Sequence, residues 1–168
     1  MQYTIYQASA QHAQILNDIH YKSWMVCYRG MLDDDFLDTM DSQRWINPFQ
    51  KMIGESLYAA VLETDGRPAG CVTYRLSDQP YDNQRTGEIV SFYFLPDFWG
   101  EGIAAPLMQW VLTELKQMGC IYASLWVLEQ NQRAQRFYKK MGFLLTSELL
   151  YSNMGRQKTT DFRMIKAL

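Results

Sequence analysis

The order of hydrophobic and polar positions along the chain predicts alternating strands and helices. Residues 3–7 alternate as in a strand, and a helical pattern then runs from about residue 10 to residue 28, with Ser9 as its N-cap. Gly30 ends this helix. A second helical pattern covers residues 33–53, and its leading aspartates favour a helix N-terminus. The first third of the chain is therefore expected to be one strand followed by two helices.

From Leu57 onward the period changes to two, which is the period of a strand. The runs 57–63 and 69–76 flank an Asp-Gly-Arg-Pro turn and predict a β-hairpin, and the strand-like run 88–95 ends at Pro96. The remaining pattern predicts a helix over 102–118, a strand over 121–128, a helix over 131–141, a strand over 143–152 and a strand over 160–166. This order predicts an α/β sandwich on a mixed sheet, in a single domain of residues 1–168.

Composition and charge exclude several classes of protein. A chain of 168 residues can bury roughly 70% of its unfolded surface, so it needs neither disulfides nor a metal to fold. Its net charge of -2 gives no electrostatic footprint for nucleic acid. The first residues lack the pattern of a signal peptide, and no apolar run is long enough to span a bilayer. We therefore expect a cytoplasmic protein without nucleic-acid or membrane partners.

The cysteines and histidines predict no metal site. Cys27, Cys71 and Cys120 are widely spaced, and only His12 and His20 could accompany them as ligands. A nucleophilic cysteine usually needs a nearby histidine base, and both histidines lie in the first predicted helix. The three thiols are therefore interpreted as small buried hydrophobic groups.

Residues 98–105, with the sequence FWGEGIAA, form a glycine-rich turn between a predicted strand and a predicted helix. Such a turn can hold a phosphate on the free N–H groups of the helix N-terminus, or it can simply use glycine at positive φ. The string also fits the dinucleotide fingerprint GxGxxA. That fold, however, needs an acid about 20 residues later, and residues 118–128 contain none. A P-loop lysine is absent too, so the turn by itself leaves the ligand open.

Two motifs make the chain resemble the GNAT superfamily of acetyl-CoA-dependent N-acetyltransferases, most strongly over residues 87–143. The family's pyrophosphate motif, Q/R-x-x-G-x-G/A, resembles residues 99–104, with Trp99 in place of the usual Gln or Arg. The downstream motif N-x-x-A-x-x-x-Y-x-x-x-G-F is similar to the run from Asn131 to Phe143. The resemblance implies a GNAT-like α/β sandwich: a mixed, mostly antiparallel sheet of six to seven strands flanked by about four helices.

The resemblance also implies roles for individual residues. Tyr138 is expected to be the general acid that protonates the sulfur of coenzyme A, and Glu88 the general base. The family carries a bulge in the strand at residues 88–95, which no sequence pattern reveals. The cofactor-binding residues implied by the resemblance are Phe92, Tyr93, Phe94, Gly100, Glu101, Gly102, Ile103, Ala104, Ala105, Asn131 and Tyr138.

The acceptor pocket implied by the resemblance is formed by Trp24, Tyr28, Arg29, Asp33 to Asp35, Tyr93 and Trp126. An aromatic, acidic pocket would suit a small cationic amine; equally, the aromatics can be core and the acids a helix cap. The implied function is acetyl transfer from acetyl-CoA to a primary amine, in a small molecule or at a peptide N-terminus, by direct attack in a ternary complex. A homodimer is compatible with the resemblance. The alternatives are a catalytically silent acetyl-CoA-binding module on the same fold and a dinucleotide-binding domain.

Overall fold

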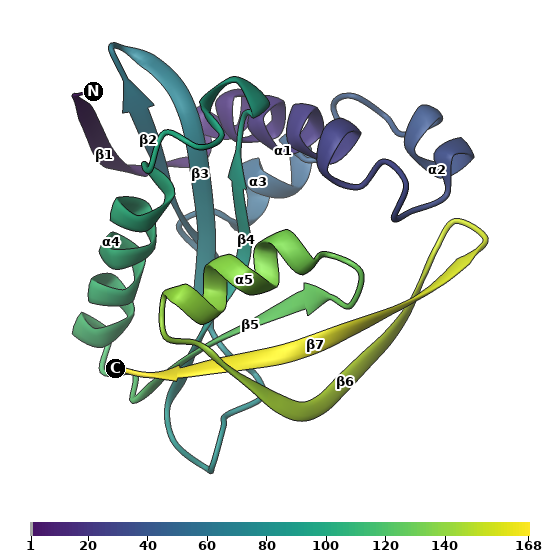
Figure 1. Cartoon of the computed structure of the whole chain (residues 1–168). Coiled ribbons are helices and arrows are strands. Elements are labelled where there is room, and N and C mark those ends of the chain that lie inside the picture. The colour runs from purple at the N-terminus through teal and green to yellow at the C-terminus, as the bar shows by residue number, and fades with distance from the viewer. Residues whose placement is uncertain (1) are drawn as a thin grey trace.

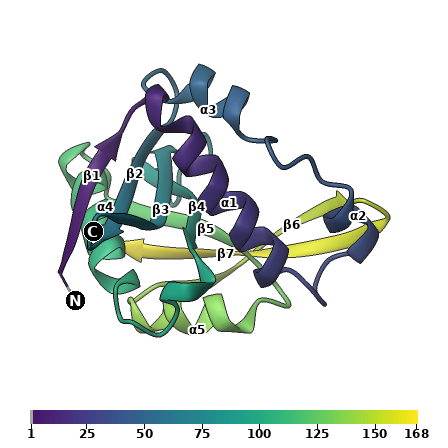
Figure 2. The same cartoon turned by 90° about the horizontal axis from the view of Figure 1, so that it is seen from above.

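Residues 2–168 of the chain are described by a computed structural model, and they form one sheet with helices on both faces (Figures 1 and 2). The sheet has seven strands in the order β1-β2-β3-β4-β5-β7-β6. Only β4 and β5 pair in parallel. The predicted fold class, a mixed and mostly antiparallel α/β sandwich, is confirmed. The strands are β1 (Tyr3–Ala8), β2 (Tyr58–Thr64), β3 (Arg67–Leu76), β4 (Thr86–Phe94), β5 (Tyr122–Leu128), β6 (Leu144–Met154) and β7 (Gln157–Ala167).

The helices divide between the two faces of the sheet (Figure 2). The helix α1 (Ala13–Cys27), preceded by a short 3-10 turn over Ala10–His12, packs with α3 (Ile46–Met52) on one face. On the other face lie α4 (Ala104–Gln117) and α5 (Gln132–Lys140). The remaining helix is the short α2 (Asp34–Asp38).

The prediction of one helix over residues 33–53 was wrong, because this stretch forms α2 and α3 with an irregular connection between them. Two local interactions compete with a continuous helix there. The Asp41 side chain accepts a hydrogen bond from the Gln43 N–H at 2.9 Å, which favours a turn. The buried Asn17 of α1 donates to the Ser42 carbonyl at 2.9 Å and accepts from the Trp45 N–H at 3.1 Å. Asn17 therefore satisfies backbone groups that a helix would otherwise have paired.

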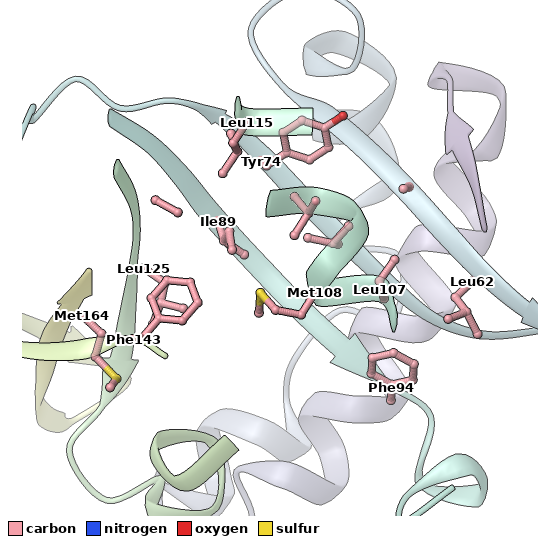
Figure 3. Close-up of a cluster of buried hydrophobic side chains, with 14 of the residues drawn as sticks. Leu62, Tyr74, Ile89, Phe94, Leu107, Met108, Leu115, Leu125, Phe143 and Met164 are labelled. Carbon is pink, nitrogen blue, oxygen red and sulfur yellow. The ribbon is translucent and has the colours of Figure 1, made fainter. Parts of the chain in front are cut away.

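The larger core lies between the sheet and α4 (Figure 3). One side of α4 is fully buried, because its apolar residues recur at helical spacing and face β3, β4 and β5. The predicted C-terminal stop is present as well, since Gly119 has a φ of 80°. The buried residues of α4 are Leu107, Met108, Val111 and Leu115.

A β-bulge interrupts the pairing of β3 with β4. Thr73 pairs with Ser91, but the next residue, Tyr74, pairs with Ile89, so Val90 is an extra residue in β4. The bulge gives β4 a bend in its middle. It is present where the resemblance implied one.

The two central strands separate just beyond this bulge. The parallel pairing of β4 with β5 ends at Ile89 and Leu125, although β4 continues to Phe94 and β5 to Leu128. The sheet therefore opens at the carboxyl ends of its two middle strands, which is where α/β sheets commonly bind ligands.

The long hairpin of β6 and β7 reaches from this opening to α2 (Figure 1). At its tip the Gln157 side chain donates to the Met31 carbonyl at 2.8 Å. Met154 packs against the cluster of Leu32 and Leu37. The hairpin and the connection between α1 and α2 thus form a continuous wall beside the opening.

We expect Leu107→Ala to lower the free energy of unfolding by about 2–5 kcal/mol, because it leaves a cavity in a core that cannot close completely. Urea unfolding followed by circular dichroism measures the change. Leu144→Ala is the matched control: its side chain is 69% exposed, and a change within about 0.5 kcal/mol is expected. Equal losses in the two variants would contradict the assigned core.

Candidate active site

A cleft of about 600 Å³ occupies the opening between β4 and β5. It extends from the N-terminus of α4 past α5 to the C-terminal part of α1 and the β6–β7 hairpin. Of the residues predicted from the sequence to form the site, most line this cleft, and the exceptions are Arg29, Asp33 to Asp35, Glu88 and Glu101. Those that line the cleft are Trp24, Tyr28, Phe92, Tyr93, Phe94, Gly100, Gly102, Ile103, Ala104, Ala105, Trp126, Asn131 and Tyr138.

The glycine turn forms one end of the cleft, and its residues 99–103 precede helix α4. Gly100 and Gly102 have φ values of +88° and +77°, which side chains of L-residues rarely adopt. The N–H groups of residues 100–103 donate to no carbonyl within the described chain, and α4 begins only at Ala104. Open space surrounds both glycines, where an added Cβ would meet nothing within 4 Å. Free N–H groups at a helix N-terminus next to open space can hold an anion such as a pyrophosphate.

Pro106 does not weaken α4. The sequence places this proline near the helix start, where its missing N–H could have cost the bond to the Gly102 carbonyl. Because α4 begins at Ala104, Pro106 is its third residue, and the N–H groups of the first turn have no partner inside a helix in any case.

Trp99, which departs from the family motif, connects three parts of the cleft. Its indole N–H donates to the Phe94 carbonyl at 2.9 Å, which fixes the end of β4. The guanidinium of Arg133 lies 4.0 Å from the centre of the indole ring, within the range of a cation–π interaction. Trp99 therefore holds a cation of α5 beside the glycine turn.

The helix α5 brings Asn131 and Tyr138 to the cleft. Asn131 is the N-cap of α5, and its side chain accepts a hydrogen bond from the Ala134 N–H at 3.1 Å. Tyr138, two turns later, packs edge-on against Phe92 and Phe143. Its hydroxyl forms no hydrogen bond with any residue of 2–168, and burial raises the pKa of Tyr138 well above its usual value. The phenol is therefore protonated at neutral pH and free to donate.

Aromatic side chains of α1 and β4 form the opposite part of the cleft. The hydroxyls of Tyr28 and Tyr93 are hydrogen-bonded at 3.1 Å, and Trp24 packs edge-on against Tyr28 with ring centres 4.8 Å apart. Burial raises the pKa of Tyr28 to about 12, so this tyrosine is neutral at neutral pH. This part of the cleft is therefore apolar and aromatic, with few charges.

The structure does not bring Glu88 into the cleft. Glu88 precedes the bulge and faces Arg75 of β3, whose Nε lies 2.7 Å from a Glu88 carboxylate oxygen. The Glu88 side chain is only 13% exposed. The ion pair with Arg75 thus holds the Glu88 carboxylate outside the residues that line the cleft. The role of Glu88 as the base stays a prediction from the sequence.

The aspartates at the start of α2 also lie outside the cleft. Asp33 accepts a hydrogen bond from the Asp35 N–H at 3.2 Å and caps α2. Arg29 pairs with Asp34 at 3.3 Å and with Asp38 at 2.8 Å on the surface. Of the two interpretations left open by the sequence, the helix cap is the one that the structure contains.

Instead, a carboxylate that the sequence reasoning missed lines the cleft. Asp161 lies on β7 opposite Leu128 of β5, and its side chain forms no ion pair or hydrogen bond with another side chain of residues 2–168. Burial raises the pKa of Asp161 above its usual value. In the sequence, Asp161 is a single acidic residue within a predicted strand. Such residues are too common to indicate a functional site.

Cys71 and His20 form a contact that the sequence did not predict. The Cys71 sulfur lies 3.5 Å from Nδ1 of His20, and both residues are buried. His20 also contacts the Leu16 carbonyl through Nδ1 at 2.7 Å and the Ser91 hydroxyl through Nε2 at 2.8 Å. Burial lowers the pKa of His20 to about 4 and raises that of Cys71, so the thiol stays protonated. The pair packs the core between α1 and the sheet and is no activated nucleophile.

Residues 2–168 contain no group of three or more His, Cys, Asp or Glu side chains that could hold a metal ion. Within the same residues, no helix is both long enough and apolar enough to cross a membrane.

Comparison with known proteins identifies the family. The sequence model of the acetyltransferase (GNAT) family matches residues 14–143, more than half of the chain. The chain belongs to this family. The resemblance to the GNAT superfamily that the two sequence motifs indicated is therefore confirmed.

Individual GNAT proteins resemble the chain over much of its length. An uncharacterized N-acetyltransferase of Mycobacterium tuberculosis is 35% identical over 104 residues, which are 62% of this chain and 63% of that protein. The chain thus spans less than two thirds of that relative. Another uncharacterized N-acetyltransferase, from Archaeoglobus fulgidus, is 31% identical over 124 residues, covering 72% of this chain and 82% of the relative.

A solved structure shares the GNAT fold. The PaiA N-acetyltransferase of Thermoplasma acidophilum, in complex with coenzyme A, covers 100% of both chains with a TM-score of 0.78 at 18% sequence identity. This likeness extends over the whole sheet, including the β6–β7 hairpin that the family match does not reach.

We expect the three thiols to differ in their reaction with iodoacetamide at pH 8. Cys71 and Cys120 should stay unmodified in the folded protein, because both are buried and burial raises their pKa values. Cys27, which is half-buried in the cleft, should react slowly. Mass spectrometry of peptides measures each site, with protein unfolded in urea as the control in which all three react. Rapid labelling of Cys71 in the folded protein would contradict its assignment to the core.

Proposed function

We propose that the chain transfers an acetyl group from acetyl-CoA to a primary amine by direct attack within a ternary complex. The observation that carries the proposal is a single cleft that contains an anion cradle at one end, a free phenol in the middle and an aromatic pocket at the other end. A reaction between two bound substrates needs these three parts in one connected space.

The glycine-turn end of the cleft suits coenzyme A. Its pyrophosphate would lie on the free N–H groups of residues 100–105, with Arg133 adding positive charge nearby. Beyond Ile89 the backbone of β4 has no partner on β5, so its groups on that side over Phe92 to Phe94 are available to the pantetheine arm. The exception is the Phe94 carbonyl, which already accepts hydrogen bonds from Ser23 and Trp99. The donor supplies the acetyl group as a thioester, whose carbonyl a backbone N–H of this strand would polarise.

Tyr138 fits the role of the general acid. Loss of coenzyme A from the acetyl group produces a thiolate, and a proton donor stabilises it as it departs. A tyrosine whose pKa is raised holds its proton throughout the neutral range, and its hydroxyl has no competing partner within the described chain. No covalent enzyme intermediate is needed, which agrees with the unreactive environment of Cys71.

The acceptor end suits an amine on an apolar or aromatic body. Trp24, Tyr28, Tyr93 and Trp126 provide flat apolar surface, and neutral tyrosine hydroxyls provide hydrogen bonds. A peptide N-terminus or a small amine would each satisfy this description.

We expect the purified chain to release coenzyme A thiol from acetyl-CoA when primary amines and peptide N-termini are supplied, and to yield the N-acetylated acceptor. Thiol detection measures the rate, and mass spectrometry identifies the product. Tyr138→Phe should lower kcat by about 10²-fold or more, since a general acid contributes on this scale, while the affinity for acetyl-CoA stays unchanged. Binding of acetyl-CoA without turnover of any amine in the library would overturn the proposal and favour a silent binding module.

We also expect Gly100→Ala and Gly102→Ala each to weaken coenzyme A binding by about tenfold, because a residue with a Cβ in the left-handed region costs about 1–2 kcal/mol and shifts the cradle. Calorimetric titration with coenzyme A measures the affinity. Gly66→Ala is the matched control, since Gly66 has a φ of +74° in the turn between β2 and β3, outside the cleft. This control should lose stability but keep its affinity for coenzyme A.

A further inference from the structure

The acceptor end of the cleft contains one carboxylate without a counter-ion. Among residues 2–168, Asp161 is the only acidic residue that lines the cleft. Its neighbours on the wall, Leu32, Leu128 and Met154, are apolar and supply no charge. A half-buried carboxylate without a partner is costly unless a ligand compensates its charge.

Asp161 shares the cleft with the phenol of Tyr138. The side chains of Asp161, Tyr28 and Tyr138 all line this one cavity. A nitrogen atom held by Asp161 would therefore lie in the same connected space as the Tyr138 hydroxyl.

We infer that Asp161 binds the ammonium group of the acceptor and takes its proton, so that the acceptor is a cationic primary amine on an apolar body. This inference rests on the proposed acetyl transfer and names as the base a residue that lines the cleft, which Glu88 does not. The aromatic groups of the pocket would contact the body of the acceptor, and Asp161 its charge.

The protons balance in this scheme. The Asp161 carboxylate takes one proton from the ammonium, and the free amine then attacks the carbonyl carbon of the thioester. The bond between that carbon and sulfur breaks, and Tyr138 gives its proton to the departing sulfur. The tyrosinate regains a proton from the nitrogen of the new amide, and Asp161 releases its proton to solvent. The sum is amide, free thiol and one proton.

Other titratable groups of the cleft do not compete for this role. The tyrosines and Cys27 are neutral at neutral pH because burial raises their pKa values, and Arg133 and Lys140 carry positive charge. The titratable groups that share the cleft with Asp161 are Cys27 and Tyr28 of α1, Tyr93 of β4, and Arg133, Tyr138 and Lys140 of α5.

The test is Asp161→Asn, which keeps the shape of the side chain and removes its charge. With alkyl amines at pH 7, kcat/KM should fall at least 10²-fold, and the rate should continue to rise with pH toward the pKa of the free amine, about 10.4 for a lysine-like amine. Amine affinity, measured by calorimetry in the presence of coenzyme A, should fall at least tenfold. Aryl amines, which are neutral at pH 7, should lose little in either measurement.

Two controls separate this inference from the proposed function. Asp65→Asn makes the same chemical change in the turn between β2 and β3, outside the cleft, and should leave both measurements unchanged. Thermal unfolding and coenzyme A binding check that the Asp161 variant is folded. If wild-type protein acetylates alkyl amines and Asp161→Asn does so equally well, the inference about Asp161 fails while acetyl transfer stands. Equal losses for alkyl and aryl amines would also overturn it.

Discussion

The separation of β4 from β5 is the feature on which the rest of this site depends. Two parallel strands that stayed paired to their ends would leave no space for a ligand and no free backbone groups to bind one. Here the extra residue Val90 bends β4, and the parallel ladder stops at Ile89. Beyond that point, backbone N–H and C=O groups on one side of β4 face the cleft and not a neighbouring strand. The glycine turn, α5 and the tyrosines are all arranged around that opening.

The local structure at the glycine-turn end of the cleft could be predicted from the sequence because its residues follow one another along the chain. The glycine turn, α4, β5 and α5 lie between Trp99 and Met141, and their geometry follows from local rules: positive φ at glycine, a helix N-terminus and a two-turn spacing. Gly100 and Gly102 adopt the conformation that only glycine adopts readily, and Asn131 caps its helix. Turns, helix ends and caps are set by residues that are close in the sequence, so a sequence pattern can predict them.

The residues at the opposite end of the cleft were predicted less completely, because only the tertiary fold brings them together. Whether Glu88 faces the cleft depends on the register between β3 and β4 and on Arg75, which stands 13 positions earlier in the sequence. Asp161 reaches the cleft because β7 inserts between β5 and β6, an order that no local pattern reveals. The helix over residues 33–53 failed for the same reason, since the buried Asn17 of another helix pairs with its backbone.

The β6–β7 hairpin forms a wall of the cleft that lies beyond the family match. The family match ends at residue 143, before β6 begins, so the hairpin and Asp161 lie outside the part of the chain that the GNAT model recognises. The hairpin is nonetheless tied to the connection between α1 and α2 by the bond from Gln157 to Met31. A change of length or sequence in this arm would reshape one wall of the cleft without altering the glycine turn or α5. One wall of the cleft is therefore built from a part of the chain that the family match does not include.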